Sequence, residues 1–249
     1  MATKHKKIFI YGKHAVREAL LHSPKSITTV YLSPQMREPD LMALIRSNNI
    51  KTERIDAKKV SSQVEGNAPH QGIIAGISVH GLVTPFEQFI GRYTPGKDVL
   101  VYLDGVTDPH NVGTIVRASA AFGATAVLIP EHGGVQVNGT IIKTSAGAAF
   151  AIPLISVPNG QQALAELKRK GVAICGLAGE GAQSIADEEF LGATLFVLGN
   201  EAEGISGSAR ALCGKMLRIP ISKNVESLNV ASAATAALYA WSTQRTARS

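Results

Sequence analysis

Several features that mark particular classes of protein are scarce or missing in this sequence. Its 249 residues include two cysteines and one tryptophan, and aromatic residues make up only 5% of the chain. The cysteines, Cys175 and Cys213, lie 38 positions apart, with no CxxC pair and no histidine pair nearby. This spacing argues against a zinc site or a disulfide framework, and we expect both thiols to be buried and reduced.

Signals for membranes and export are also missing. No apolar run approaches the roughly 20 residues that a membrane-spanning helix needs. The lysine-rich start, MATKHKK, lacks the apolar core and cleavage site of a signal peptide. A chain that is 45% hydrophobic and 18% charged is typical of a globular protein, so we expect a folded, cytoplasmic protein without a membrane partner.

The positive charge of the chain is concentrated in one part. Residues 1–97 contain 14 Lys and Arg against 7 Asp and Glu, a net charge of +7, whereas residues 98–249 contain 11 against 12, a net charge of −1. Basic charge gathered in one domain favours a polyanionic partner, because each neutralised phosphate releases counterions. A merely basic surface without such a partner explains the charge equally well.

Strands and helices alternate along the first 77 residues, which predicts a small α/β domain. The predicted strands are 8–10, 27–32, 51–55 and 72–77, and the predicted helices are the stretch YGKHAVREALLHS, 40–48 and 57–63. Residues 78–97 then carry five Gly and Pro residues, the composition of a connection between domains, although Phe86, Phe89 and Ile90 indicate that part of it packs.

A second α/β unit begins at Asp98 with the strand VLVYLD. Further strands are predicted at 125–129, 152–157, 172–177, 195–198 and 216–219, and helices at 112–122, 161–170 and 229–241. Nearly continuous apolar strands are typical of a parallel sheet that is covered on both faces. We therefore predict a mostly parallel α/β sheet with a ligand site at the carboxyl ends of its strands.

The common fingerprints of such a site are missing. The chain has no GxGxxG after the first strand of this unit, no GxxxxGK[ST], no GxSxG and no HExxH. Dinucleotide-binding, NTP-binding, serine hydrolase and zincin functions therefore lack their key residues.

Three other stretches place polar residues near that edge of the sheet. They are DGVTDPHNVGTIVRASAAFG (104–123), LFVLGNEAEGIS (195–206) and LRIPISKNVESLNVASAATAALYAW (217–241). Asn111, Ser227 and Asn229 each stand where a side chain caps a following helix, which is the simplest role for each. Arg117 lies about 9 Å along its helix from Asn111 and leans back toward the helix start, although a surface salt bridge is the usual role of a helical arginine.

In order and spacing, these stretches resemble the three motifs of the SpoU branch of the SPOUT RNA methyltransferases. The likeness runs from Ile10 to Trp241, and the YGxHAVxEAL start and the HQG turn at 70–72 resemble the family's L30e-like RNA-binding domain. The resemblance implies an α/β fold with a small L30e-like N-terminal domain and a mostly parallel-sheet SPOUT catalytic domain that ends in a trefoil knot. The expected boundaries are 1–77 for the RNA-binding domain, 78–97 for a linker and 98–249 for the methyltransferase domain.

The resemblance also implies methyl transfer from S-adenosylmethionine to a ribose 2′-hydroxyl of RNA. The catalytic residues that it carries over are Asn111, Arg117, Glu201, Ser227 and Asn229. Because a guanidinium keeps its proton at physiological pH, which opposes a role as base, we expect Arg117 to anchor phosphate and to stabilise the developing alkoxide. Glu201 fits the family's G-x-E pattern and would orient Arg117 or hold the amine of the cofactor, whereas Glu203 fits a solvated loop acid.

The cofactor is expected against the knot, in contact with backbone groups and apolar side chains. The positions that match the family are Gly199, Ile219 and Leu228, with Leu177, Ala178 and Gly179 as further candidates. No metal is required by this chemistry, and no cluster of metal ligands stands out. The family further implies a homodimer through the knotted domain.

Several functions stay open at this point. The resemblance favours methylation of a guanosine in the peptidyl-transferase P loop of 23S rRNA. A tRNA ribose 2′-O-methyltransferase and a resistance-type rRNA methyltransferase share the three motifs. A non-catalytic, RNA-binding ribosome assembly factor is the alternative of another class, and the presence of all five catalytic positions argues against it. Residues 131–151 depart from the family pattern, so no site residue is assigned there.

Overall fold

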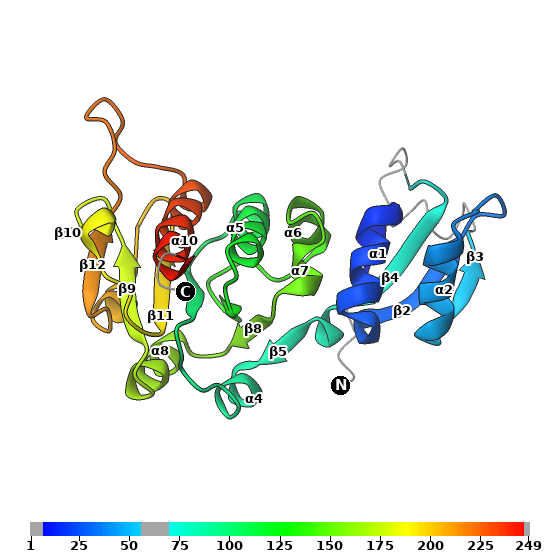
Figure 1. The fold of residues 1–249 in the computed structure, drawn as a ribbon, viewed down its shortest axis with the longest axis horizontal. Coiled ribbons are helices and arrows are strands. Elements are labelled where there is room, and N and C mark those ends of the chain that lie inside the picture. Colours follow the sequence, from blue (N-terminus) through cyan, green and yellow to red (C-terminus); the bar gives the residue numbers. More distant parts are fainter. Residues whose placement is uncertain (1–6, 56–69, 247–249) are drawn as a thin grey trace. The chain divides into compact units, whose positions relative to one another are not determined.

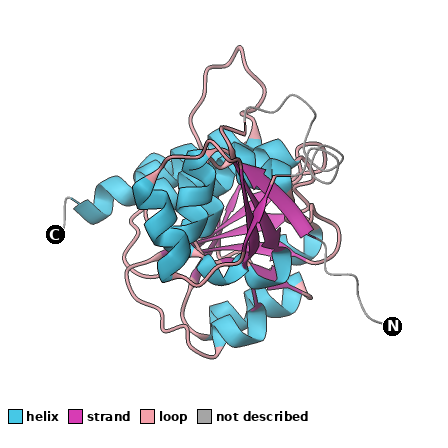
Figure 2. Cartoon of the chain, turned by 90° about the vertical axis from the view of Figure 1, so that its right-hand side faces the viewer, coloured by secondary structure: helices cyan, strands magenta, loops and turns pink. Residues whose placement is uncertain are grey.

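The computed structural model describes residues 7–55 and 70–246 and divides the chain into two compact units (Figure 1). One unit consists of Met1–Val83 with Val137–Ala151, and the other consists of Thr84–Gln136 with Ile152–Ser249. Figure 2 shows the chain coloured by element type, with helices in cyan and strands in magenta. Of the helices in the described part of the chain, none is long and apolar enough to cross a membrane.

The first unit is built on a four-stranded sheet in the order β1-β4-β2-β3. Strand β4 is antiparallel to β1 and β2, and β3 is parallel to β2. Its elements are β1 (Lys7–Tyr11), α1 (Lys13–His22), η1 (Pro24–Ser26), β2 (Ile27–Leu32), α2 (Pro39–Ser47), β3 (Thr52–Arg54), β4 (Ile73–Ser78) and η2 (Val79–Gly81). They confirm the predicted alternation of strands and helices, and the helix predicted at 57–63 lies outside the described residues.

The two N-terminal motifs of the sequence meet at the start of α1. Gln71 and Gly72 adopt positive φ angles of 51° and 80°, which turn the chain into β4. The side-chain oxygen Oε1 of Gln71 then accepts a hydrogen bond of 3.1 Å from the backbone N–H of Lys13. Gly12, with φ of 90°, donates its N–H to the carbonyl of Ile73 at 3.2 Å. The tyrosine-glycine start and the HQG turn therefore form one structure.

Residues 137–151 belong to this first unit, which differs from the single methyltransferase span expected at 98–249. They form α6 (Gly139–Thr144), which packs on β1, and α7 (Ala148–Ala151), which packs on α1. The hydroxyl of Ser23 donates a hydrogen bond of 2.9 Å to the carbonyl oxygen of Phe150. Ile141, Ile142 and Phe150 are buried, and this apolar content is the physical reason that the segment joins a core instead of crossing solvent as a loop.

The second unit is built on an eight-stranded sheet in the order β10-β12-β9-β11-β6-β7-β8-β5. The pairings from β10 through to β8 are all parallel, as predicted. Its elements are β5 (Val83–Pro85), α4 (Phe86–Ile90), β6 (Val99–Asp104), α5 (Pro109–Ala121), β7 (Ala126–Pro130), β8 (Leu154–Val157), α8 (Gly160–Arg169), β9 (Ala173–Leu177), β10 (Gln183–Ser184), η3 (Ile185–Asp187), β11 (Thr194–Gly199), α9 (Gly207–Arg210), β12 (Lys215–Arg218) and α10 (Val230–Thr246).

The segment expected as a linker contributes to this sheet and its core. β5 lies at the edge next to β8, and Phe86, Ile90 and Tyr93 are buried among side chains of β6, β8 and α8. Glycine and proline therefore mark turns within the unit here, because the aromatic and aliphatic residues between them pack. The central strands β6, β7 and β11 are buried along most of their length, and α5 packs against α10.

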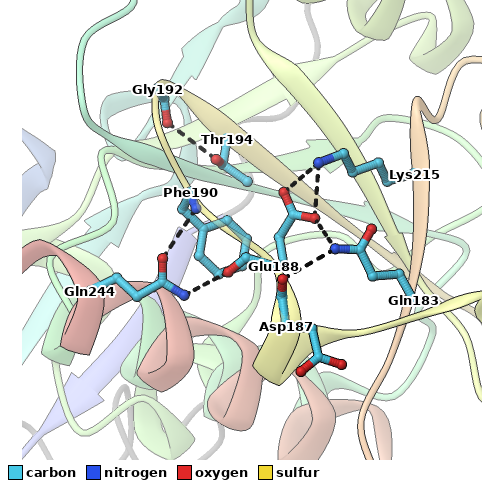
Figure 3. Close-up of polar contacts among 8 residues, drawn as sticks. All are labelled: Gln183, Asp187, Glu188, Phe190, Gly192, Thr194, Lys215 and Gln244. Carbon is cyan, nitrogen blue, oxygen red and sulfur yellow. Dashed lines mark hydrogen bonds and ion pairs between the residues drawn. The ribbon is translucent and has the colours of Figure 1, made fainter.

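A polar network beside the amino end of β12, which we call the Glu188 cluster, consists of Gln183, Glu188, Lys215 and Gln244 (Figure 3). The Glu188 side chain is 5% exposed and accepts hydrogen bonds from Lys215 Nζ at 2.6 and 2.9 Å and from Gln183 Nε2 at 2.8 Å. Gln244, near the end of α10, donates to the Glu188 carbonyl at 2.7 Å and accepts from the Phe190 N–H at 3.2 Å. This cluster holds the last helix to the segment before β11.

Candidate functional site

The carboxyl ends of the central strands surround one pocket of about 520 Å³. This volume lies within the range of roughly 300–1,000 Å³ that is usual for small-molecule sites. Nine of the predicted site residues line it, namely Leu177, Ala178, Gly179, Gly199, Glu201, Ile219, Ser227, Leu228 and Asn229. The loops after β9, β11 and β12 and the start of α10 thus come together at this pocket.

Asn111 links two of these loops. Its Nδ2 donates a hydrogen bond of 2.7 Å to Oε1 of Glu201, and its Oδ1 accepts one of 3.0 Å from Nδ2 of Asn229. The simplest role predicted for Asn111, that of a helix cap, is wrong because α5 begins at Pro109 and its cap is Asp108, whose Oδ1 accepts from the N–H of His110 at 2.9 Å. The Asn111 side chain therefore does not cap the helix. Instead, it joins the second motif to the third.

Asn229 caps α10, which is one of the roles predicted for it, and it also binds Asn111. Its Oδ1 accepts hydrogen bonds from the N–H groups of Ala231 at 2.9 Å and Ser232 at 3.4 Å, which caps the start of α10. Its Nδ2 remains available and binds Asn111. Ser227 is exposed at the pocket, and its hydroxyl makes no hydrogen bond to another described residue. The cap holds Asn229 in place, and Ser227 has a hydroxyl that can bind a ligand.

Arg117 lies outside the pocket lining. It is exposed on α5 and forms neither a salt bridge nor a side-chain hydrogen bond within residues 7–55 and 70–246. The expected contact with Glu201 is not formed, since the Glu201 carboxylate instead accepts from Asn111. The catalytic role of Arg117 stays a prediction.

Two residues that fix the site were not identified from the sequence. Asn200 donates from Nδ2 to the carbonyl of Gly105 at 2.8 Å, and its Oδ1 accepts from the N–H groups of Ala202 at 2.8 Å and Glu203 at 3.2 Å. Asp104 accepts a hydrogen bond of 2.6 Å from the N–H of Ser206. Both residues join the first motif to the second. An asparagine and an aspartate directly at strand ends are the signal that was available.

Two glycines allow close approach of chain segments, Gly199 in the pocket lining and Gly181 outside it. A Cβ on Gly199 would overlap the backbone of Gly204 and Ile205, and a Cβ on Gly181 would overlap the backbone of Leu217 and Arg218. Gly179, which also lines the pocket, has no neighbour within 4 Å of such a Cβ. The first two positions therefore require glycine for packing, whereas Gly179 does not.

Carboxylates dominate the charge of the pocket. Glu180, Glu201, Glu203 and Glu226 line it, together with the cation Arg210. Glu180 accepts a hydrogen bond of 2.8 Å from Nη1 of Arg210, and this bond lowers the pKa of the Glu180 carboxyl below its ordinary value. Within the described residues, no group of three or more His, Cys, Asp or Glu side chains is arranged to hold a metal ion. The arrangement suits a cationic organic ligand.

Comparison with family models divides the chain as the motifs do. Residues 98–239 match the SpoU rRNA Methylase family, and residues 9–79 match the RNA 2′-O ribose methyltransferase substrate binding family.

Relatives of similar length accompany these matches. The chain is 34% identical over 236 residues to the 23S rRNA (guanosine-2′-O-)-methyltransferase RlmB of Pseudomonas putida, covering 92% of this chain and 94% of the relative. It is 35% identical over 246 residues to the same enzyme of Xylella fastidiosa, covering 97% and 98%. Both likenesses run nearly from end to end.

Solved structures share the fold. The SpoU methyltransferase AviRb of Streptomyces viridochromogenes, in complex with AdoMet, superimposes with a TM-score of 0.82 at 23% identity, covering 96% of this chain and 91% of that one. An AdoMet-bound rRNA methyltransferase of Sinorhizobium meliloti gives a TM-score of 0.80 at 21% identity, with coverages of 94% and 86%.

Proposed function

The chain belongs to the SpoU rRNA methylase family, and from this premise we propose that it transfers a methyl group from S-adenosylmethionine to the 2′-hydroxyl of a guanosine in 23S rRNA. The relatives named as guanosine-2′-O-methyltransferases of 23S rRNA match it over both units. The N-terminal match to a substrate-binding family agrees with an RNA substrate.

One observation carries the proposal beyond sequence likeness. The hydrogen bonds from Asn111 to Glu201 and from Asn229 to Asn111 join all three motifs beside one pocket. A surface that kept the motifs only for folding would not need three polar side chains to converge at the carboxyl edge of the sheet. Such convergence is what a reaction requires, because reacting groups gain most from fixed positions.

The residues of the pocket fit S-adenosylmethionine. Leu177, Ile219 and Leu228 offer apolar walls for an adenine, and the carboxylates favour a ligand with a positive sulfonium. The cofactor, when bound, supplies a methyl group that an oxygen nucleophile displaces from sulfur. The tight crossings at Gly181 and Gly199 support the trefoil knot that the family implies, against which the cofactor would lie.

The chain's own side chains would position the ribose and manage its proton. Asn111 holds the Glu201 carboxylate, and that carboxylate can accept a hydrogen bond from the ribose or from the amine of the cofactor. The Ser227 hydroxyl, which lines the same pocket, would bind the same sugar edge. The Arg117 side chain is long enough to reach back toward the start of α5, where it would stabilise the negative charge that develops on the 2′-oxygen.

Substrate selection is assigned to the first unit. Its basic side chains would bind RNA phosphates, and a nucleotide in a loop can be turned out of its helix at little cost. We propose the peptidyl-transferase P loop as target, the cytoplasm as location and a homodimer as the working form. Tyr239 on α10 is 59% exposed and offers apolar surface for a dimer contact.

The test is methyl transfer in vitro with tritiated S-adenosylmethionine. Unmodified 23S rRNA, a P-loop fragment and tRNA are compared as acceptors. We expect incorporation into the first two at a guanosine ribose and none into tRNA. Preference for tRNA would move the protein to the tRNA branch, and absence of transfer to any of them would favour an assembly factor.

A further inference from the structure

We propose that Arg210 recognises the carboxylate of the methionine part of the cofactor, and that Glu180 holds the Arg210 side chain in place until the cofactor replaces it. This inference rests on the proposed function, because it takes S-adenosylmethionine as the ligand of the pocket. It adds a residue that determines specificity and that belongs to none of the three motif positions described above.

The charges of the pocket and of the cofactor are complementary in detail. At neutral pH the cofactor has a positive sulfonium, a positive ammonium and one negative carboxylate. Four glutamates line the pocket, and Arg210 is the single cation among its described lining residues. The glutamates suit the two positive groups, but they would repel the carboxylate. Of the lining side chains, Arg210 alone can attract it.

The position of Arg210 is set by the site itself. Arg210 is the last residue of α9, whose first N–H groups are capped by the Ser206 hydroxyl, which accepts from the N–H of Ala209 at 3.3 Å. The backbone of Ser206 is in turn bound to Asp104 at the end of β6. Helix α9 is therefore anchored to the first motif, and the base of the Arg210 side chain is fixed at the pocket.

The guanidinium is nevertheless available to a ligand. Nη1 donates to Glu180 Oε1 at 2.8 Å, and no other described residue takes a hydrogen bond from this guanidinium. A guanidinium has five N–H donors and matches a carboxylate with two parallel bonds, so one bond to Glu180 leaves most of its capacity unused.

Exposure makes the pair exchangeable. The side chains of Arg210 and Glu180 are 45% and 64% exposed, and exposed ion pairs contribute little to stability. Glu180 follows Gly179, one of the expected cofactor contacts, so the pair stands directly at the pocket. Replacing one carboxylate by another at Arg210 keeps the charge balance, and Glu180 can then turn into water.

The proposal is tested by the ratio of two dissociation constants measured by calorimetry. One ligand is S-adenosylmethionine, and the other is decarboxylated S-adenosylmethionine, which differs only in lacking the carboxylate. For the unaltered protein we expect the decarboxylated ligand to bind about tenfold more weakly, the effect of a partly exposed charged hydrogen bond. In Arg210→Ala the ratio should fall to about one, because only the natural ligand loses a partner.

Three further variants sharpen the test. Arg210→Lys keeps a positive charge but loses the paired N–H donors of the guanidinium. This variant should give an intermediate ratio of dissociation constants. Glu180→Gln removes the competing carboxylate and should raise the ratio above that of the unaltered protein. Arg169→Ala, an exposed arginine of α8 outside the pocket, should leave it unchanged. The ratio cancels any general loosening of the pocket, which would weaken both ligands alike.

Several outcomes would overturn the proposal. A ratio of one in the unaltered protein means that the carboxylate is not recognised. Equal weakening of both ligands in Arg210→Ala means that the residue only supports the pocket, and an unchanged ratio with weaker RNA binding would make Arg210 an RNA contact. Failure of the unaltered protein to bind S-adenosylmethionine at all would instead contradict the proposed function.

Discussion

Two glutamates of the second unit each pair with a cation, yet their surroundings are opposite. Glu188, beside the amino end of β12, is 5% exposed and accepts three side-chain hydrogen bonds. Glu180, beyond the carboxyl end of β9, is 64% exposed and accepts one from Arg210. A buried carboxylate must be fully paired because its desolvation costs several kcal/mol, whereas an exposed pair contributes about 0–1 kcal/mol. The Glu188 cluster therefore holds the fold at the amino edge, whereas the pair of Glu180 and Arg210 at the carboxyl edge stays available to a ligand.

The largest effect is expected from Arg117→Ala, which tests whether the carboxyl edge performs chemistry. If Arg117 stabilises the developing alkoxide, methyl transfer should fall by about 10²–10³-fold while S-adenosylmethionine binds normally. Single-turnover transfer and calorimetry measure the two quantities, with Arg169→Ala as the matched control. Near-normal turnover would make Arg117 an ordinary surface arginine.

A pair of substitutions at the start of α5 separates positioning from capping. Asn111→Ala removes the link between Glu201 and Asn229, and transfer should fall by about 100-fold because the reacting groups lose their alignment. Asp108→Ala removes the cap, and the free energy of unfolding should fall by about 1 kcal/mol with a much smaller loss of transfer. If both variants lost methyl transfer and stability to the same extent, the separate roles of Asn111 in positioning and Asp108 in capping would be contradicted.

Lys215→Met tests the amino edge. It leaves the buried Glu188 carboxylate without its cation, so the free energy of unfolding should fall by about 2–3 kcal/mol, while Glu180→Gln at the other edge should cost less than about 1 kcal/mol. Urea unfolding measures both. The ratio of the dissociation constants for S-adenosylmethionine and its decarboxylated form should stay unchanged in Lys215→Met. A change in that ratio would contradict the claim that the Glu188 cluster only stabilises the fold.

The same pair predicts an alkaline pH dependence. The hydrogen bond to Glu188 raises the pKa of Lys215 above its ordinary value. A lysine whose folded pKa is raised contributes stability that is complete below the unfolded pKa of about 10.4 and is lost as the pH rises through the folded value. The difference in stability between the unaltered protein and Lys215→Met should therefore be constant at neutral pH and should narrow above about pH 10. If the difference in the free energy of unfolding narrowed near neutral pH, the titration of Lys215 would not be its cause.

The smallest effect concerns the two thiols. Cys175 is buried, as expected, and burial raises its pKa to about 12. Cys213 is only half-buried, which differs from the expectation, and burial raises its pKa as well. A thiol reagent at pH 8 should label Cys213 first and Cys175 only when the protein unfolds, because the thiolate is the reactive form. Rapid labelling of Cys175 in the folded protein would contradict its burial.

The sequence predicted the regular parts of both units well. Strands such as Val99–Asp104 and Thr194–Gly199 are short, continuous apolar runs, and their length and apolar content predict them. Residues 78–97 were expected as a connection that packs in part through Phe86, Phe89 and Ile90, and this packing is confirmed, since Pro85 and Gly91 bound a packed helix. The start of α5 was placed too late, since Pro109 and its cap Asp108 were not recognised as a helix start.

The site was predictable from its resemblance to a family more than from physical pattern. Capping explains Asn229 fully at the level of sequence, and only the structure reveals that its second nitrogen binds Asn111. Asn200 and Arg210 act through tertiary neighbours that lie far away in the chain, at Gly105 and Glu180. The place of Asn200 at the end of a strand is a local signal for it, whereas Arg210 has no such signal.

Mapping of ribose methylation in 23S rRNA tests the central distinction most directly. Cells that lack this protein are supplied with the unaltered chain, with Glu201→Ala or with Glu188→Gln, and 2′-O-methyl groups are measured together with the amount of folded protein. We predict that the unaltered chain restores one methylated guanosine in the P loop, that Glu201→Ala is present at normal level without restoring it, and that Glu188→Gln restores it in proportion to its reduced level. Full methylation with Glu201→Ala, or no P-loop methylation with the unaltered chain, would contradict the account.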